Sequence, residues 1–282
     1  MSNKNKKKSL LIILGGLFLG VLIYFAPDRL SQKEDSVANS HDDSHEHADE
    51  TTDFTFADVD TLDQVFIDSK LELIANESDL ETKLLQFDSL ILFSIQNNYP
   101  PLVANFSEQK AILDPTETSW MLAGDNYFKA FRLSKNQSKK MIQKAIASYE
   151  KVVAMNPQTL EAQTAIGVAY VEGAAMLGEA PMKGIGILKE VLNKEPENID
   201  ALTNLGYFAI QSGQFDIAIE RFETVLNIDP KNAEAYIYLT DIYLSQENIE
   251  KGIETLEKYK TLVNDPLVKQ QVDDYIKEIK NK

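Results

Sequence analysis

The stretch that decides the fold is IDALTNLGYFAIQSGQFDIAIERFETVLNIDPKN, residues 199–232. Its apolar residues recur at intervals of three and four on both sides of Gly213, a spacing typical of two amphipathic α-helices joined by a turn. The Asp-Pro pair near its end stops the second helix, because proline has no backbone N–H to donate. Gly206 and Ala218 fall where the two helices cross, and a large side chain at either position would push the backbones apart.

The flanking sequence repeats this helix–turn–helix unit. Prolines recur at intervals of 39, 34 and 36 residues, at Pro157, Pro196, Pro230 and Pro266. Glycines recur in the first helix of successive units, at Gly124, Gly167 and Gly206. A period near 34 residues with these glycines and closing prolines resembles the tetratricopeptide repeat (TPR) family. The resemblance covers residues 117–266 and implies an all-α, TPR-type α-solenoid of about four stacked repeats, because one unit cannot bury its own apolar face.

Two further segments complete the expected folded part. Residues 54–116 contain amphipathic helical patterns, and the last two of these helices resemble a degenerate TPR in which the small signature residues are mostly missing. Residues 267–282 place Val268, Val272 and Ile276 on one side of a polar-faced helix. We expect the degenerate repeat and this last helix to cap the array, since the terminal repeats of a solenoid are atypical.

The N-terminus has the pattern of a membrane anchor. Residues 1–9 carry four lysines, and residues 10–26 form an uncharged run of 17 residues, which is about 25 Å long as a helix. Residues 28–60 hold two basic and eleven acidic residues, so the positive-inside rule keeps the lysines in the cytoplasm and places the bulk of the chain outside. The sequence therefore predicts a single-pass transmembrane signal-anchor. A cleaved signal peptide is the alternative, although Tyr24-Phe25-Ala26 gives no small-x-small cleavage site.

Gly16 and Gly20 form a G-x-x-x-G motif within this apolar run. Such a motif permits close helix–helix approach in lipid, which would give a homodimer. Glycine is also frequent in membrane helices without that role, so both interpretations stay open.

Residues 27–53 read as a disordered acidic linker, since they contain little that could pack. Within it, His41, His45 and His47 alternate with carboxylates in the sequence HDDSHEH. Imidazoles and carboxylates together can capture a divalent transition metal. No scaffold fixes their geometry, however, so a solvated charge run is the simpler interpretation and no metal site is assigned.

Composition excludes several classes of function. The net charge of −16 argues against binding nucleic acid, which takes a basic surface. The absence of cysteine excludes disulfides, thiolate metal sites and a cysteine nucleophile. All three histidines lie in the linker, and the chain has no phosphate-binding glycine loop, G-x-S-x-G or H-E-x-x-H motif. We therefore expect neither enzymatic activity nor a cofactor.

The resemblance also implies where a partner binds, because in TPR proteins positions 2, 5, 9, 12 and 13 of the first helix line the inner groove. Carried over to this chain, the expected groove residues are Met121, Asp125, Phe128, Thr164, Val168, Val171, Thr203, Tyr207, Ile210, Gln211, Ile237, Asp241 and Leu244. Chaperone-binding TPR domains clamp a terminal carboxylate with basic residues at such positions, whereas this groove is acidic. A segment with apolar side chains and some positive charge is the partner that fits.

One basic cluster stands out in this acidic chain. It contains Lys129, Arg132, Lys135, Lys139, Lys140, Lys144 and Lys151. Such a cluster either docks an anionic partner or forms the solvated face of two helices, and the sequence leaves both readings open.

The anchor and the array together resemble membrane-anchored TPR proteins of bacteria. This resemblance implies a scaffold or adaptor at the bacterial inner membrane, with the bulk of the chain in the periplasm, that binds a protein partner and aids envelope or complex assembly. Three alternatives stay open: a transition-metal buffer or sensor using the histidine linker, a chaperone of cytochrome c assembly, and the same adaptor facing the cytoplasm.

Overall fold

The computed structural model describes residues 59–133 and 139–281, and within these residues the chain folds into thirteen α-helices and no strand. The prediction of an all-helical, TPR-like solenoid is therefore confirmed for this part of the chain. Two compact units meet at residues 184 and 185, and α9 (Met182–Lys194) spans that boundary.

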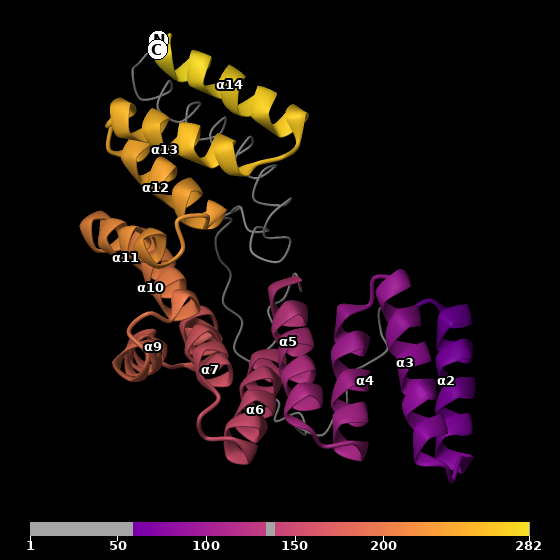
Figure 1. Ribbon diagram of the computed structural model, residues 1–282. Helices are drawn as coiled ribbons and strands as arrows, with labels where there is room; N and C mark the ends of the chain where they lie inside the picture. Colours follow the sequence, from indigo (N-terminus) through magenta and orange to yellow (C-terminus); the bar gives the residue numbers. More distant parts are fainter. Residues whose placement is uncertain (1–58, 134–138, 282) are drawn as a thin grey trace, which may run out of the picture. The chain divides into compact units, whose positions relative to one another are not determined.

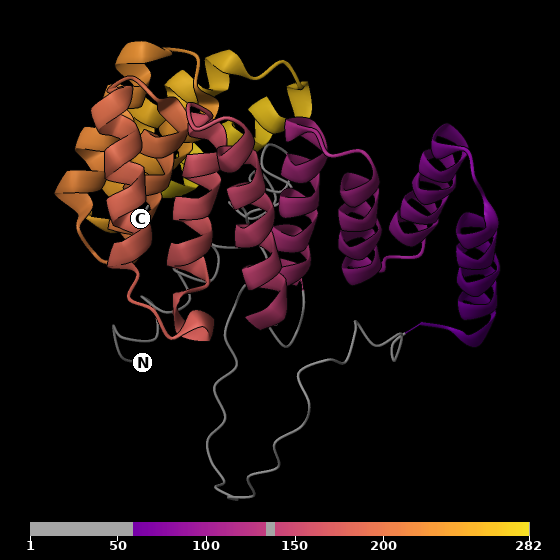
Figure 2. The same cartoon turned by 90° about the horizontal axis from the view of Figure 1, so that it is seen from below.

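The first unit is a series of antiparallel helices, each packed against the one before it (Figure 1). Figure 2 shows α2 to α6 from below as neighbouring rods. The helices of this unit are α2 (Thr61–Asn76), α3 (Leu80–Gln96), α4 (Pro100–Leu113), α5 (Glu117–Leu133), α6 (Lys139–Met155), α7 (Leu160–Glu172) and the single turn α8 (Ala174–Leu177).

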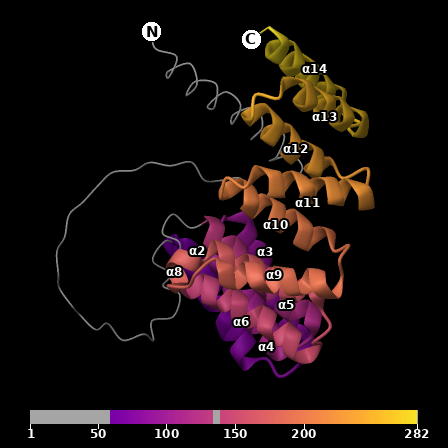
Figure 3. The same ribbon diagram turned by 90° about the vertical axis from the view of Figure 1, so that its left-hand side faces the viewer.

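The second unit continues the same arrangement. Figure 3 shows its helices following one another as layers. They are α10 (Ile199–Gln211), α11 (Phe215–Ile228), α12 (Ala233–Ser245), α13 (Ile249–Leu262) and α14 (Pro266–Lys280). Helix α14 buries Val268, Val272 and Ile276 and thereby closes the apolar cluster shared with α12 and α13.

No helix in residues 59–133 or 139–281 has the length and apolarity needed to cross a bilayer. The predicted basic tail (1–9), signal-anchor (10–26) and acidic linker (27–53) lie outside the described residues, as do Gly16, Gly20 and the three histidines. The anchor, the dimer and the metal alternatives therefore stay predictions.

Within a repeat, the two helices approach closely because a small residue faces a large one. A Cβ atom at Gly206 of α10 would lie only 2.8 Å from the ring of Phe222 of α11, and Ala218 is fully buried. The structure thus places both small residues at the crossing, as the sequence predicts. In α12 the corresponding residue is Thr240, whose hydroxyl bonds to that of Thr255 of α13 at 2.7 Å.

The turn between paired helices has one geometry in three repeats. Asn98, Gly213 and Glu247 each adopt a left-handed backbone with φ of 57°, 73° and 62°, and the flanking N–H groups donate to the last carbonyls of the preceding helix in the same pattern. Gly213 and Glu247 stand 14 residues after the starts of their repeats at Ile199 and Ala233. The same spacing from Asn98 gives residues 84–116 as a repeat.

The close crossing at Gly206 generates a prediction. We expect Gly206→Ala to lower the free energy of unfolding by about 1–2 kcal/mol, because the added methyl group displaces a buried ring and this outweighs the gain in helix propensity. The matched control is Gly186→Ala in α9, where nothing lies within 4 Å of the added Cβ. That variant should gain roughly 0.5–1 kcal/mol. Urea unfolding followed by helical circular dichroism measures both, and equal shifts for the two variants would contradict the close approach.

Candidate partner-binding groove

The repeat at 84–116 places exposed apolar side chains at groove positions. Counted from Leu84, positions 2, 9 and 12 of α3 are Leu85, Leu92 and Ile95, which are 61%, 56% and 58% exposed. The buried residues of α3, Phe87 and Leu90, lie on the opposite side of the helix. This part of the first unit therefore offers apolar surface in the place where a TPR array contacts its partner.

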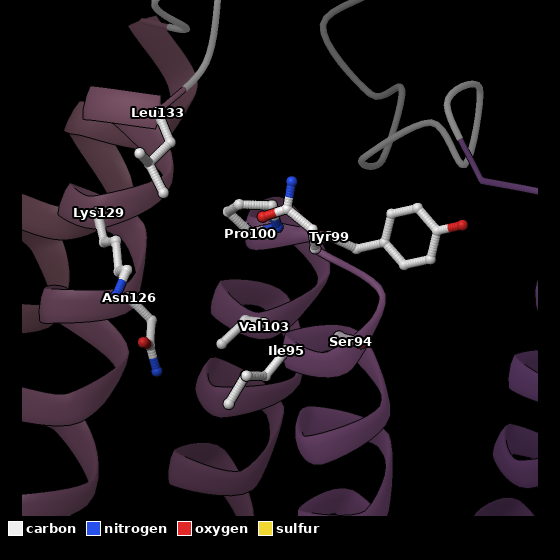
Figure 4. A pocket seen from close by; sticks show the side chains of 9 residues that line it. Ser94, Ile95, Tyr99, Pro100, Val103, Asn126, Lys129 and Leu133 are labelled. Atoms are coloured by element: carbon white, nitrogen blue, oxygen red, sulfur yellow. The ribbon is translucent and has the colours of Figure 1, made fainter. Parts of the chain in front are cut away.

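A cavity of about 230 Å³ opens beside these side chains, between α3, α4 and α5 (Figure 4). Its apolar walls come from Ile95, Pro100, Val103 and Leu133. Its polar lining includes Asn98, Asn126 and Lys129, and the Asn126 amide donates to the Ser107 hydroxyl at 2.9 Å. The cavity is the right kind of site for an apolar side chain whose backbone remains near polar groups.

Sequence reasoning missed the groove positions of α3, because the small residues of a TPR are absent from this repeat. Position 8 is Ile91 and position 20 is Val103, where the other repeats have mainly glycine or alanine. Two signals were available. Asn98 is a residue that tolerates the left-handed turn, and Pro115 stands 31 residues after Leu84, as Pro230 does after Ile199.

In the next repeat, the predicted groove residues of α5 are partly engaged inside the protein. Met121 is half-buried against the cluster around Trp120. Phe128 is also half-buried, with the Arg132 guanidinium 4.2 Å from its ring centre. The Asp125 carboxylate accepts a 2.9 Å hydrogen bond from the Tyr149 hydroxyl. Burial and this nearby carboxylate raise the pKa of Tyr149 well above its usual value, so the hydroxyl stays protonated and keeps donating.

The basic cluster supplies two internal ion pairs. Arg132 donates from two nitrogens to the two carboxylate oxygens of Glu172, at 2.8 and 2.6 Å, and both side chains are about three-quarters buried. Lys144 pairs with Glu108 and lies over the ring of Tyr127. At least these two cations are therefore part of the packing between helices. Lys135 lies outside the described residues.

Four predicted groove residues are buried, with exposed fractions of 2–8%. They are Thr164, Val168, Thr203 and Ile237. Val171 is half-buried and lies close to Gly184. A partner that docks without moving a helix cannot contact the four buried side chains, so these positions pack within the repeats instead.

The second unit keeps the remaining predicted residues near the surface. On α10, Tyr207 and Ile210 are half-buried, and the Gln211 amide donates to the Tyr207 hydroxyl at 2.7 Å. On α12, Leu244 is half-buried and Asp241 is exposed.

Asp241 differs from the other predicted acid, Asp125, in having no partner. Within the described residues its carboxylate makes no hydrogen bond or ion pair. The surrounding protein atoms desolvate the carboxylate and raise its pKa above the usual value. An incoming cation would therefore be favoured at this place.

The metal alternative gains nothing from the described residues, which hold no group of three or more side chains able to bind a metal ion. The linker histidines lie outside them.

Comparison with known proteins identifies the repeat directly: residues 209–270 match the tetratricopeptide repeat family. No curated protein sequence matches the chain. Among solved structures, PilW, described as a widely conserved type IV pilus biogenesis factor, is 17% identical, with 64% of this chain and 78% of that chain covered and a TM-score of 0.48.

Two further similar structures are a MamA fragment from Desulfovibrio magneticus RS-1 and YrrB. The MamA fragment is 14% identical, covers 64% of this chain and 94% of its own, and has a TM-score of 0.45. YrrB, described as a TPR protein with an unusual peptide-binding site, is 19% identical, covers 75% of this chain and 99% of its own, and has a TM-score of 0.41.

The desolvated carboxylate of Asp241 generates a pH-dependent prediction. Because its folded-state pKa is raised, the ionised form costs stability as the pH rises above the unfolded pKa, which is about 3.9. We expect Asp241→Asn to be more stable than the wild type at pH 7, with the difference vanishing below about pH 4. The control is Glu220→Gln on α11, an exposed position where little change is expected at either pH. Urea midpoints at both pH values measure this, and a destabilised Asp241→Asn at pH 7 would contradict it.

Proposed function

Residues 209–270 belong to the tetratricopeptide repeat family, and from this premise we propose that the chain is a membrane-anchored adaptor that holds a protein partner in its groove. TPR folds are scaffolds suited to protein–protein interaction, and the described helices form such a scaffold. The partner would bind through its side chains rather than undergo a reaction, since nothing in the sequence favours catalysis.

The observation that carries the proposal is the exposure of large apolar side chains at groove positions. Leu85, Leu92 and Ile95 are each more than half exposed along one face of α3. Covering apolar surface contributes about 25 cal/mol per Å², so a partner segment with apolar side chains gains free energy along this face. The polar ends of the repeats would then set orientation and specificity.

The charge of the groove narrows the partner further. In the first unit Asp125 and Glu172 are already bonded to Tyr149 and Arg132, whereas in the second unit Asp241 is not bonded. A lysine or arginine of the partner would pair with this carboxylate. This supports a segment with both apolar side chains and positive charge.

The anchor and the location complete the proposal. The lysine-rich tail, the apolar run of residues 10–26 and the acidic segment after it support one crossing of the bacterial inner membrane with the repeats on the periplasmic side. In that place the adaptor would aid assembly of an envelope complex by keeping its partner close to the membrane.

Partner contact is tested by photocrosslinking in living cells. A photoreactive amino acid at Leu92 of α3 should capture a protein partner, because this side chain faces the proposed groove. The matched control is Ile112 of α4, in the same repeat and 60% exposed but on the second helix. Mass spectrometry identifies the captured chain, and equal capture at both positions would contradict a groove-directed partner.

Topology is tested by thiol labelling, for which the chain offers a cysteine-free background. With the outer membrane permeabilised, an impermeant maleimide should label Lys231→Cys, in the exposed turn between α11 and α12. Ser2→Cys should react only after the inner membrane is lysed. The reverse pattern would place the repeats in the cytoplasm.

A further inference from the structure

The cavity beside α3 has apolar walls that the described residues leave uncovered. Ile95 and Leu133, which line it from α3 and α5, are 58% and 50% exposed. Figure 4 shows Ile95, Val103 and Leu133 around one space, with Asn126 and Lys129 beside them. An apolar group entering this space would remove their surface from water.

The size of the cavity suits one aromatic ring. A cavity of about 150 Å³ lined by aliphatic side chains is enough to bind benzene, and this one measures about 230 Å³. The amides of Asn98 and Asn126 in its lining are suited to meet the backbone of the residue that carries the ring.

The chain enters the described structure close to this cavity. Tyr99, which is part of its lining, accepts a hydrogen bond from the Asp60 backbone N–H at 3.3 Å and donates to the Asp63 carboxylate at 2.7 Å. Its ring points away from Leu133 and Lys129 (Figure 4), and these two bonds hold the start of α2. The residues before Val59 are therefore tethered within one tyrosine side chain of the cavity.

The sequence directly before this point carries two aromatic side chains, Phe54 and Phe56. An extended chain covers at most about 3.5 Å per residue, so Phe56 reaches about 10 Å from Val59 and Phe54 about 17 Å. Either ring can therefore span the α3–α4 turn. No other aromatic residue lies between Asp28 and Val59, so this pair is the aromatic group that the tether brings to the cavity.

We propose that the cavity between α3, α4 and α5 is a receptor for a phenylalanine ring, and that its occupant is Phe54 or Phe56 of the same chain. The end of the acidic linker is then docked at the groove side of the repeat at 84–116. This inference concerns the chain's own linker and does not depend on the identity of any partner.

Disulfide trapping in the full chain tests the proposal, since the natural sequence has no cysteine. The pair Thr55→Cys and Lys129→Cys places one thiol between the two phenylalanines and one in the cavity lining. Docking should make this pair oxidise at least about tenfold faster than the same pair with Phe54→Ser and Phe56→Ser, because docking raises the effective concentration of the two thiols. The two proteins share every tether length and differ only in the rings.

A second variant changes the cavity instead of the linker. Ile95→Glu alters a side chain that is already exposed and introduces a charge beside the proposed ring, so it should slow oxidation of the same pair by a similar factor while helical circular dichroism is unchanged. Slowing in both variants supports the proposal. Equal oxidation rates with and without the two rings overturn it, as does a disulfide that joins two copies of the chain instead of closing within one.

Discussion

Each repeat of this chain depends on the close approach of its two helices, which requires a small residue opposite a large one. At Gly206 the ring of Phe222 lies where a Cβ atom would be, and in the next repeat a bond between two threonine hydroxyls takes the same role. The apolar faces meet only because the backbones come this close. Since a solenoid repeat is stable only against its neighbours, a change at one crossing affects the adjoining repeats as well.

The same stacking determines what the groove offers. Successive first helices place equivalent positions on one side, yet the chemistry at those positions differs between repeats. In α5 the carboxylate of Asp125 is bonded to Tyr149 of the paired helix. In α12 the equivalent Asp241 has no such bond, and desolvation raises its pKa. A partner therefore meets a different electrostatic environment at equivalent positions of different repeats.

Internal charge pairing also explains the basic cluster of an otherwise acidic chain. Arg132 and Lys144 extend from neighbouring helices to Glu172 and Glu108, and all four side chains are mostly buried. Breaking one of these pairs would leave a desolvated charge, which is costly. Two cations that appear in the sequence as part of a docking surface are thus required for packing between repeats.

The sequence by itself determined the helical repeat, its period and its boundaries, because the spacing of apolar residues, glycine and proline acts locally on the backbone. It predicted the TPR-like array, and it identified the helices within 54–116 without the register that Asn98 and Pro115 define. Only the tertiary structure decided which groove positions reach solvent. Thr203 and Ile237 occupy groove positions but are buried, whereas Leu92, in a repeat without the signature glycine, is exposed. Exposure depends on how neighbouring repeats pack against each helix, and that contact joins residues far apart in the chain.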